Sequence, residues 1–348
     1  MPTSSILPKL PENDVCLTLT PHMREYDALF SDSGAIRWVP YVMYFQPAGH
    51  RSRVVNTDSL GFRFTQCDGR PIAVAEPDGI GVVNVLAGSS TVFGIGATSD
   101  ATTLASRMNA RRAKGSPPWV NMGGRSHNST QELLLYVLLR HRLPHVEHIV
   151  IFSGFNDLAL ARLPSKETLE GGAFFLCHTF FERLSDGQRA NRRPIRAGHR
   201  DEQGSRAAVD WRQPDVDLQT RRAAALVLSN LDTWRMLAKS AGAKLTYVLQ
   251  PLAGWVRDGG CEEERQLFAY LDKQGRFSET YGDISTPMVG ERYARLLREG
   301  CVGMGVHFVD MRQRLAAALA DDDWMFVDRI HFSDFGHDLT AELLQDVT

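Results

Sequence analysis

The sequence predicts an α/β protein in which a mostly parallel, five-stranded sheet lies between two layers of helices. Two observations support this fold class. Short apolar runs rich in β-branched residues alternate along the chain with longer stretches whose apolar residues recur at helical spacing. Several of these runs end in small, polar or glycine residues, which is typical of the loops where an open α/β sheet binds its ligands.

The expected elements follow this alternation. The first strand lies in the stretch Val82 to Gly96, whose second half is small, hydroxylated and punctuated by glycine. The following strands are expected at residues 119–122, 147–152, 244–249 and 306–309. Helices are expected at residues 102–113, 129–142, 217–241, 289–301 and 335–344.

The N-terminal part is expected to be an extension of the core. Residues 1–79 are interpreted as an arm and β extension that packs on a domain of residues 80–348. Residues 38–45 and 51–56 look extended and lead into a turn-rich segment. Asn56 and Arg63 have two interpretations here, a hairpin that covers a sheet edge or direct contact with a substrate.

Two insertions interrupt the domain, at about residues 162–214 and 253–287. The first is long enough to be a functional lid and is rich in arginine (Arg189, Arg192, Arg193, Arg196, Arg200, Arg206). The second contains a helical stretch at residues 262–273 and an aromatic residue, Trp255, which we expect in the wall of a substrate pocket together with Gln250.

Composition excludes several classes of protein. The chain has 348 residues, 43% hydrophobic and 23% charged, with a formal charge of −2, so nothing indicates binding to nucleic acid or to a membrane surface. The five cysteines are scattered, which favours reduced thiols over disulfides or a zinc site. No apolar leader or membrane-spanning stretch is visible. A cytoplasmic protein of unknown oligomeric state is expected.

No cofactor or metal is expected. His141, His145 and His148 could suggest a metal cluster, but Pro144 breaks the helix that would align them. Gly94-Ile95-Gly96 lacks the third glycine of a dinucleotide-binding fingerprint.

Four stretches carry residues suited to acyl transfer. Ser90 follows the first strand as a candidate nucleophile, and Asn156 follows the third strand as a neutral hydrogen-bond donor. Near the C-terminus, His331 is a candidate base, with Asp328 three residues earlier to orient it. His337 is the nearest competitor for the base, but it lacks a carboxylate at that spacing and is expected to pack or face solvent.

The order of these stretches resembles the SGNH hydrolases, also called the GDSL esterase/lipase superfamily, in a bacterial branch with a Gly-Ser-Ser-Thr nucleophile block. The resemblance runs from about Asn56 to the end of the chain and implies a flavodoxin-like sheet of order 2-1-3-4-5. It implies the triad Ser90, Asp328 and His331. It also implies an oxyanion hole, the group of donors that stabilises the negatively charged oxygen of the transition state, made by Ser90, Ser126 and Asn156.

Two departures from the family pattern bear on this assignment. The first block reads Gly88-Ser89-Ser90, so the acidic residue beside the nucleophile is absent. Ser126 stands where the family has a glycine, and a serine adopts positive φ less readily. Gly124, or Gly123, would take its place if the register differs.

Three functions therefore remain open. The first is a serine esterase that removes a small acyl group, acetyl by resemblance, from a polar small molecule such as a sugar or a biosynthetic intermediate. The second is an acyltransferase that uses the same acyl-enzyme and a lid that excludes water, with the Arg-rich insertion holding an anionic donor or acceptor. The third is a non-catalytic binding protein whose oxyanion hole is degenerate at Ser126.

Overall fold

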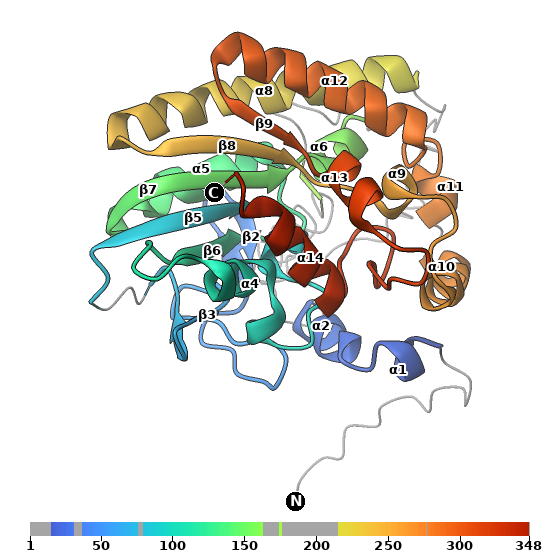
Figure 1. Ribbon diagram of the computed structural model, residues 1–348, viewed down its shortest axis with the longest axis horizontal. Coiled ribbons are helices and arrows are strands. Elements are labelled where there is room, and N and C mark those ends of the chain that lie inside the picture. The colour runs from blue at the N-terminus through green and yellow to red at the C-terminus, as the bar shows by residue number, and fades with distance from the viewer. Residues whose placement is uncertain are drawn as a thin grey trace, which may run out of the picture.

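A five-stranded parallel sheet forms the centre of the computed structural model (Figure 1), which describes residues 15–30, 37–75, 79–162, 174–175, 215–275 and 277–347. The spatial order is β6-β5-β7-β8-β9, which confirms the predicted order 2-1-3-4-5. The strands are β5 (Val82–Gly88), β6 (Trp119–Gly123), β7 (His145–Ser153), β8 (Lys244–Leu249) and β9 (His307–Asp310).

The register brings the carboxyl ends of the strands to one edge of the sheet. Gly88, the last residue of β5, pairs with Gly123 of β6 on one side and with Phe152 of β7 on the other. The loops that follow these three strands therefore begin next to one another, with the β5 loop in the middle.

Helices cover both faces of the sheet, because successive strand residues point to opposite sides. Val85 and Ala87 of β5 pack on the side of α5 (Ser129–Leu139), α8 (Val216–Ala241) and α12 (Pro287–Met304). Leu86 packs on the other side, with α4 (Leu104–Arg111), α13 (Met311–Ala318) and α14 (Asp334–Leu344). The three-layer sandwich predicted from the sequence is confirmed (Figure 1).

In its described ranges, the N-terminal extension contains two short helices and two hairpins. The helices are α1 (Val15–Leu19) and α2 (Met23–Phe30), and the hairpin strands are β1 (Arg37–Val39), β2 (Met43–Phe45), β3 (Thr65–Cys67) and β4 (Arg70–Ile72). The predicted extended run 38–45 is thus a hairpin. Residues 51–56 form no strand, because the Ser52 hydroxyl accepts hydrogen bonds from the amides of Val54 and Val55 and closes a turn instead.

Short helices and turns complete the domain. They are α3 (Ser90–Phe93), η1 (Asp100–Thr102), η2 (Arg140–Arg142), α6 (Phe155–Leu160), α9 (Ala253–Val256), α10 (Glu262–Gly275) and α11 (Phe277–Tyr281). The helix expected in the second insertion is therefore present as α10. The arginines of the first insertion and Cys177 lie outside the described residues.

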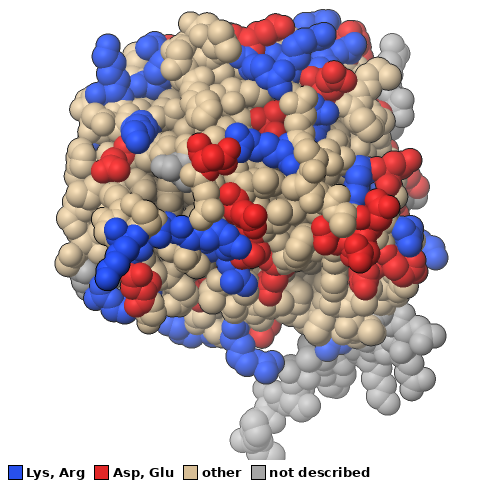
Figure 2. Space-filling view, in the orientation of Figure 1, with Lys and Arg blue, Asp and Glu red and all other residues tan. Residues whose placement is uncertain are grey.

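Charges of both signs are spread over the face seen in Figure 2, and neither sign covers it. Across the ranges that the structure describes, no helix combines the length and the apolar character needed to cross a membrane.

Candidate active site

Ser90 lies where β5 turns into α3, at the carboxyl edge of the sheet and between the ends of β6 and β7. It is the first residue of α3, so its N–H has no carbonyl to bind within the helix. Its own carbonyl accepts hydrogen bonds from the amides of Gly94 and Ile95, which fixes the turn. The residue is only 6% exposed, so its hydroxyl is held in a largely desolvated position.

His331 reaches Ser90 from the loop that precedes α14. Its Nε2 lies 2.8 Å from the Ser90 Oγ, and its Nδ1 lies 2.7 Å from Oδ2 of Asp328. A carboxylate oxygen only accepts, so Nδ1 carries the proton and Nε2 offers its lone pair to the serine hydroxyl. The structure thus brings together the three residues predicted as a triad, in hydrogen-bond contact and in the order nucleophile, base and orienting carboxylate.

Asp328 is held in place by its own loop. Its Oδ1 accepts hydrogen bonds from the amides of Ile330 and His331, both at 2.7 Å. Burial by itself would raise the pKa of Asp328, but the His331 imidazole and these amides outweigh it and hold the pKa below its usual value. The carboxylate is therefore ionised at neutral pH and can stabilise a positively charged imidazole.

Two contacts tie the His331 loop to the nucleophile loop. Gly96 has φ of +96°, and a Cβ there would lie 2.2 Å from the carbonyl oxygen of Phe332, so only glycine allows this close approach. Asp334, the first residue of α14, accepts hydrogen bonds from the amide and the hydroxyl of Thr98. The Ser90 and His331 segments, 241 residues apart in sequence, are therefore fixed against each other.

Ser126 lies in the loop after β6 with a φ of +56°, in the left-handed region. The two glycines that were alternatives to it have their amides engaged elsewhere. Gly124 N–H donates to the carbonyl of Gly88 at 3.0 Å, and Gly123 N–H donates to Oδ1 of Asn121 at 2.8 Å. Ser126 thus remains the candidate for a backbone oxyanion donor in this loop, in the backbone conformation that glycine usually supplies.

Asn156 lies in the first turn of α6, on the other side of Ser90. Gly154, with a φ of +129°, permits the tight turn after β7. The Asn156 carboxamide is 8% exposed, and one of its N–H groups donates to the carbonyl of His127 at 2.7 Å. This contact joins the β7 loop to the β6 loop, and the amide has a second N–H for an oxyanion.

Two buried carboxylates stand behind this part of the site. Asp157 accepts hydrogen bonds from the amide and hydroxyl of Ser129 at the start of α5. Glu132 accepts a hydrogen bond from the hydroxyl of Ser153 at 2.8 Å. Burial raises the pKa of Asp157 to about 6 and raises that of Glu132 well above its usual value. These two carboxylates join the segments around β7 to α5.

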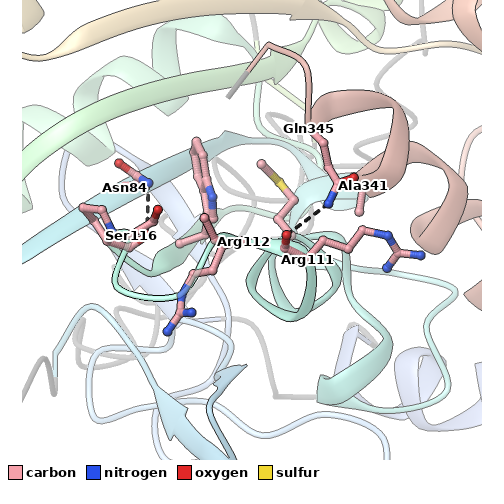
Figure 3. Close-up of a pocket in the computed structure, with 10 residues that line it drawn as sticks. Asn84, Arg111, Arg112, Ser116, Ala341 and Gln345 are labelled. Carbon is pink, nitrogen blue, oxygen red and sulfur yellow. Dashed lines mark hydrogen bonds between the residues drawn. The ribbon is translucent and has the colours of Figure 1, made fainter.

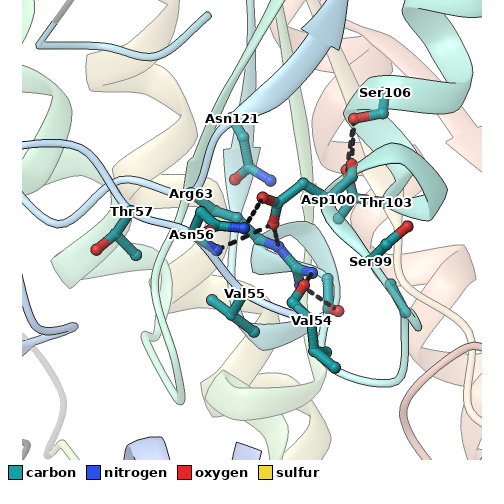
Figure 4. Close-up of polar contacts among 12 residues, drawn as sticks. Val54, Val55, Asn56, Thr57, Arg63, Ser99, Asp100, Thr103, Ser106 and Asn121 are labelled. Atoms are coloured by element: carbon teal, nitrogen blue, oxygen red, sulfur yellow. Dashed lines mark hydrogen bonds and ion pairs between the residues drawn. The ribbon is translucent and has the colours of Figure 1, made fainter. Parts of the chain in front are cut away.

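Arg63, predicted as a possible substrate contact, is fully buried and inaccessible to a ligand. Figure 4 shows its guanidinium directed at Asp100, with an N–H to carboxylate distance of 2.8 Å, and Asn56 contacts the same carboxylate through its side-chain amide at 2.7 Å. Arg63 also donates to the carbonyl of Gly94, in the nucleophile loop. The structure therefore contradicts direct substrate contact by Arg63, and it commits the Asn56 side chain to Asp100.

Gln250 and Trp255 are also buried, at 1% and 2% exposure, which contradicts their prediction as pocket walls. Gln250 donates to the hydroxyl of Thr91 at 2.8 Å and accepts from the hydroxyl of Ser89 at 3.3 Å, so it holds the residues on both sides of Ser90. Trp255 packs against Tyr293 and donates to the carbonyl of Ile284 at 2.9 Å. Sequence reasoning singled out Gln250 for the wrong role.

Among the residues that the structure describes, the other histidines are not gathered into a metal site. His337 is fully buried and packs edge-on against Phe332, which agrees with the expectation that it packs. Over the described stretches of chain, no group of three His, Cys, Asp or Glu side chains is placed to bind a metal.

A cavity of about 320 Å³ lies at the opposite end of the sheet (Figure 3). Asn84 and Trp119, at the start of β5 and β6, line it together with Arg111 and Gln345. Gly88 lies four positions further along β5 than Asn84, which is about 13 Å. None of the predicted site residues lines this cavity.

No family model and no curated protein matches the sequence. Among solved structures, the chain is similar to the acetyl xylan esterase AlAXEase, with 12% identity over 77% of this chain and 99% of that chain and a TM-score of 0.40. It is similar to a lipase/acylhydrolase from Enterococcus faecalis, with 14% identity over 76% and 92% and a TM-score of 0.39. It is also similar to a member of the lipolytic protein G-D-S-L family from Veillonella parvula DSM 2008, with 12% identity over 76% and 97% and a TM-score of 0.43.

Proposed function

We propose that the chain is a serine esterase of the SGNH type, which cleaves carboxylic esters through an acyl-enzyme. The observation that carries the proposal is the continuous hydrogen-bonded line from Ser90 Oγ through His331 to Asp328, with contacts of 2.8 and 2.7 Å. A serine hydroxyl paired with an oriented, neutral imidazole is an activated nucleophile.

The mechanism follows from this line. Ser90 Oγ attacks the ester carbonyl while His331 Nε2 accepts its proton, and the imidazolium returns that proton to the leaving alcohol. Water then attacks the acyl-enzyme with His331 again as the base, and the acid is released. Asp328 stays ionised throughout and stabilises the imidazolium. The amides of Ser90 and Ser126 and the carboxamide of Asn156 are the proposed donors to the oxyanion.

The substrate that we propose is a small O-acyl ester, acetyl in the first place, of a polar small molecule such as a sugar or a biosynthetic intermediate. Support for this choice of substrate comes from the resemblance of the four sequence stretches to the SGNH family.

One observation favours catalysis over the binding-protein alternative. The alternative required a degenerate oxyanion hole at Ser126, yet Ser126 has the positive φ that a glycine would have there. Acyl transfer to an acceptor other than water uses the same residues up to the acyl-enzyme, and the arginines that suggested it lie outside the described residues.

The test is the intact mass of the protein after exposure to a fluorophosphonate, followed by hydrolysis of p-nitrophenyl acetate. We expect one adduct, which disappears in Ser90→Ala and persists in the control Ser116→Ala, in the remote cavity. Asp328→Asn should keep the fold and lower kcat by up to ~10⁴-fold, because the imidazole loses its orienting carboxylate. A folded wild-type protein that admits the probe and forms no adduct would refute the proposal.

A further inference from the structure

The β1–β2 hairpin (Arg37–Phe45) and the residue after it lie along the loop that carries Ser126. The hydroxyl of Tyr44 donates to the carbonyl of Ser126 at 2.9 Å, and His127 Nε2 donates to the carbonyl of Tyr44 at 3.0 Å. Tyr44 therefore holds two consecutive residues of the loop, one through its side chain and one through its backbone.

The hairpin and the residue after it make two more contacts with the end of β6 and the segment that follows it. Gln46 donates through Nε2 to the carbonyl of Gly123 at 2.9 Å, and Gln131 donates through Nε2 to the carbonyl of Val42 at 2.8 Å. Residues 42, 44 and 46 thus contact the chain between Gly123 and Gln131. The N-terminal extension is in direct contact with the candidate oxyanion loop.

Ser126 needs such support because of its backbone. Its φ of +56° lies in the left-handed region, where a residue with a Cβ is strained. Without a restraint the loop would gain by relaxing to negative φ, which would turn the Ser126 amide away from its present direction. A single hydrogen bond contributes a net stabilisation of similar size to this strain.

The Tyr44 hydroxyl is well placed to provide this restraint. The residue is 2% exposed, so water has little access to its hydroxyl. Burial raises the pKa of Tyr44, which keeps the phenol protonated and able to donate. Burial likewise lowers the pKa of His127 to about 4, so its ring is neutral and the bond to the Tyr44 carbonyl fixes which nitrogen carries the proton.

We propose that Tyr44 is a positioning residue for ester hydrolysis, which holds Ser126 in its left-handed conformation so that the Ser126 amide points into the oxyanion hole. The inference rests on the proposed function and extends it, because it makes the N-terminal hairpin part of the active site. Tyr44 acts through Ser126 and does not itself contact the substrate.

The test is a double-mutant cycle between Tyr44→Phe and Ser126→Gly, assayed with p-nitrophenyl acetate and normalised to the number of sites that a fluorophosphonate labels. In the natural background, Tyr44→Phe should lower kcat about fivefold to tenfold and leave KM unchanged, because the oxyanion forms only in the transition state. In the Ser126→Gly background the loss should be below about twofold, since glycine adopts positive φ without strain. Tyr41→Phe, on the same hairpin but 70% exposed, should behave as the wild type.

Equal losses in the two backgrounds, or no loss in the natural one, would overturn the inference. If Tyr44→Phe alone does not fold, the double variant is compared with Ser126→Gly. A double variant that folds and has the same kcat as Ser126→Gly then supports the inference. A double variant that does not fold overturns it. A wild-type protein without an adduct refutes the proposed function itself, whereas an adduct on Ser90 with uncoupled variants refutes only the role of Tyr44.

Discussion

Replacing Arg63 by methionine is expected to destabilise the fold strongly, because it leaves a carboxylate buried without its cation. The guanidinium is fully buried, and the side chain of its partner Asp100 is 8% exposed. Besides Asp100, the guanidinium donates to the Tyr26 hydroxyl and to the carbonyls of Val54, Phe93 and Gly94. Methionine fills a similar volume but makes none of these five contacts.

The magnitude follows from what remains after the change. Asp100 keeps the two hydrogen bonds from the amide and the side chain of Asn56, and the Gly94 carbonyl keeps the one from Tyr26. The carbonyl of Val54 loses its guanidinium donor, and the Asp100 charge loses its counterion. Breaking a buried ion pair from one side costs about 3–5 kcal/mol, which is a large share of a domain's ~5–15 kcal/mol.

Urea unfolding followed by circular dichroism measures this loss. Arg63→Met combined with Asp100→Leu should cost less than Arg63→Met alone, because no charge is then left buried. Arg265→Met is the matched control, since Arg265 pairs with Glu262 on the surface and should cost below about 1 kcal/mol. A cost below about 1 kcal/mol for Arg63→Met, or a double variant as unstable as the sum of its parts, would refute the argument.

Two further predictions concern Gln250 and pH. Gln250→Leu leaves the buried hydroxyls of Ser89 and Thr91 without their partner. It should lower the free energy of unfolding by about 2 kcal/mol and lower kcat about tenfold. An unchanged kcat would show that Gln250 does not help to position Ser90. Burial lowers the pKa of His127 to about 4 and that of His337 to about 3. The folded protein favours the neutral form of both histidines, so their full contribution to the free energy of unfolding is present above the unfolded pKa of ~6.5. Below that pH the free energy of unfolding falls, by about 2 kcal/mol for each histidine between pH 7 and 5. The raised pKa of Asp157, about 6, acts in the opposite sense, because the folded protein takes up this proton more readily than the unfolded chain. Between pH 7 and 5 it adds about 1 kcal/mol to the free energy of unfolding. Urea unfolding at pH 7 and pH 5 measures the net fall in the free energy of unfolding, and this fall should be about 2 kcal/mol smaller in His337→Phe. The same pH dependence in that variant would contradict a lowered pKa of His337 as its cause.

The sheet and the meeting of Ser90 with its partners could be predicted because they depend on short-range patterns. Apolar runs that alternate with helical stretches indicate a parallel sheet, and the carboxyl ends of parallel strands share one edge. Ser90 and Asn156 follow adjacent strands, β5 and β7, so their proximity is a consequence of the strand order. The Asp328–His331 pair needs only its spacing of three residues and a tight loop.

The roles of Arg63 and Trp255 could not be predicted, because they depend on residues far away in the chain. An arginine in a turn-rich segment is normally exposed, and Arg63 is buried only because Asp100, 37 residues later, neutralises it. Trp255 is buried against Gly290, whose missing side chain leaves room for the indole: a Cβ there would lie 2.6 Å from it. Nothing in the local sequence of either residue indicates these partners.

The two departures from the SGNH pattern have a common structural feature. Where the pattern has an acidic residue beside the nucleophile, this chain has Ser89, whose hydroxyl binds Gln250 from the end of β8. Where the pattern has a glycine, this chain has Ser126, whose carbonyl binds Tyr44 from the N-terminal hairpin. In each case a buried polar side chain from another part of the chain makes a contact at the altered position. We expect that replacing Ser126 by glycine makes Tyr44 dispensable while leaving Gln250 as important as before, because the two contacts hold different loops.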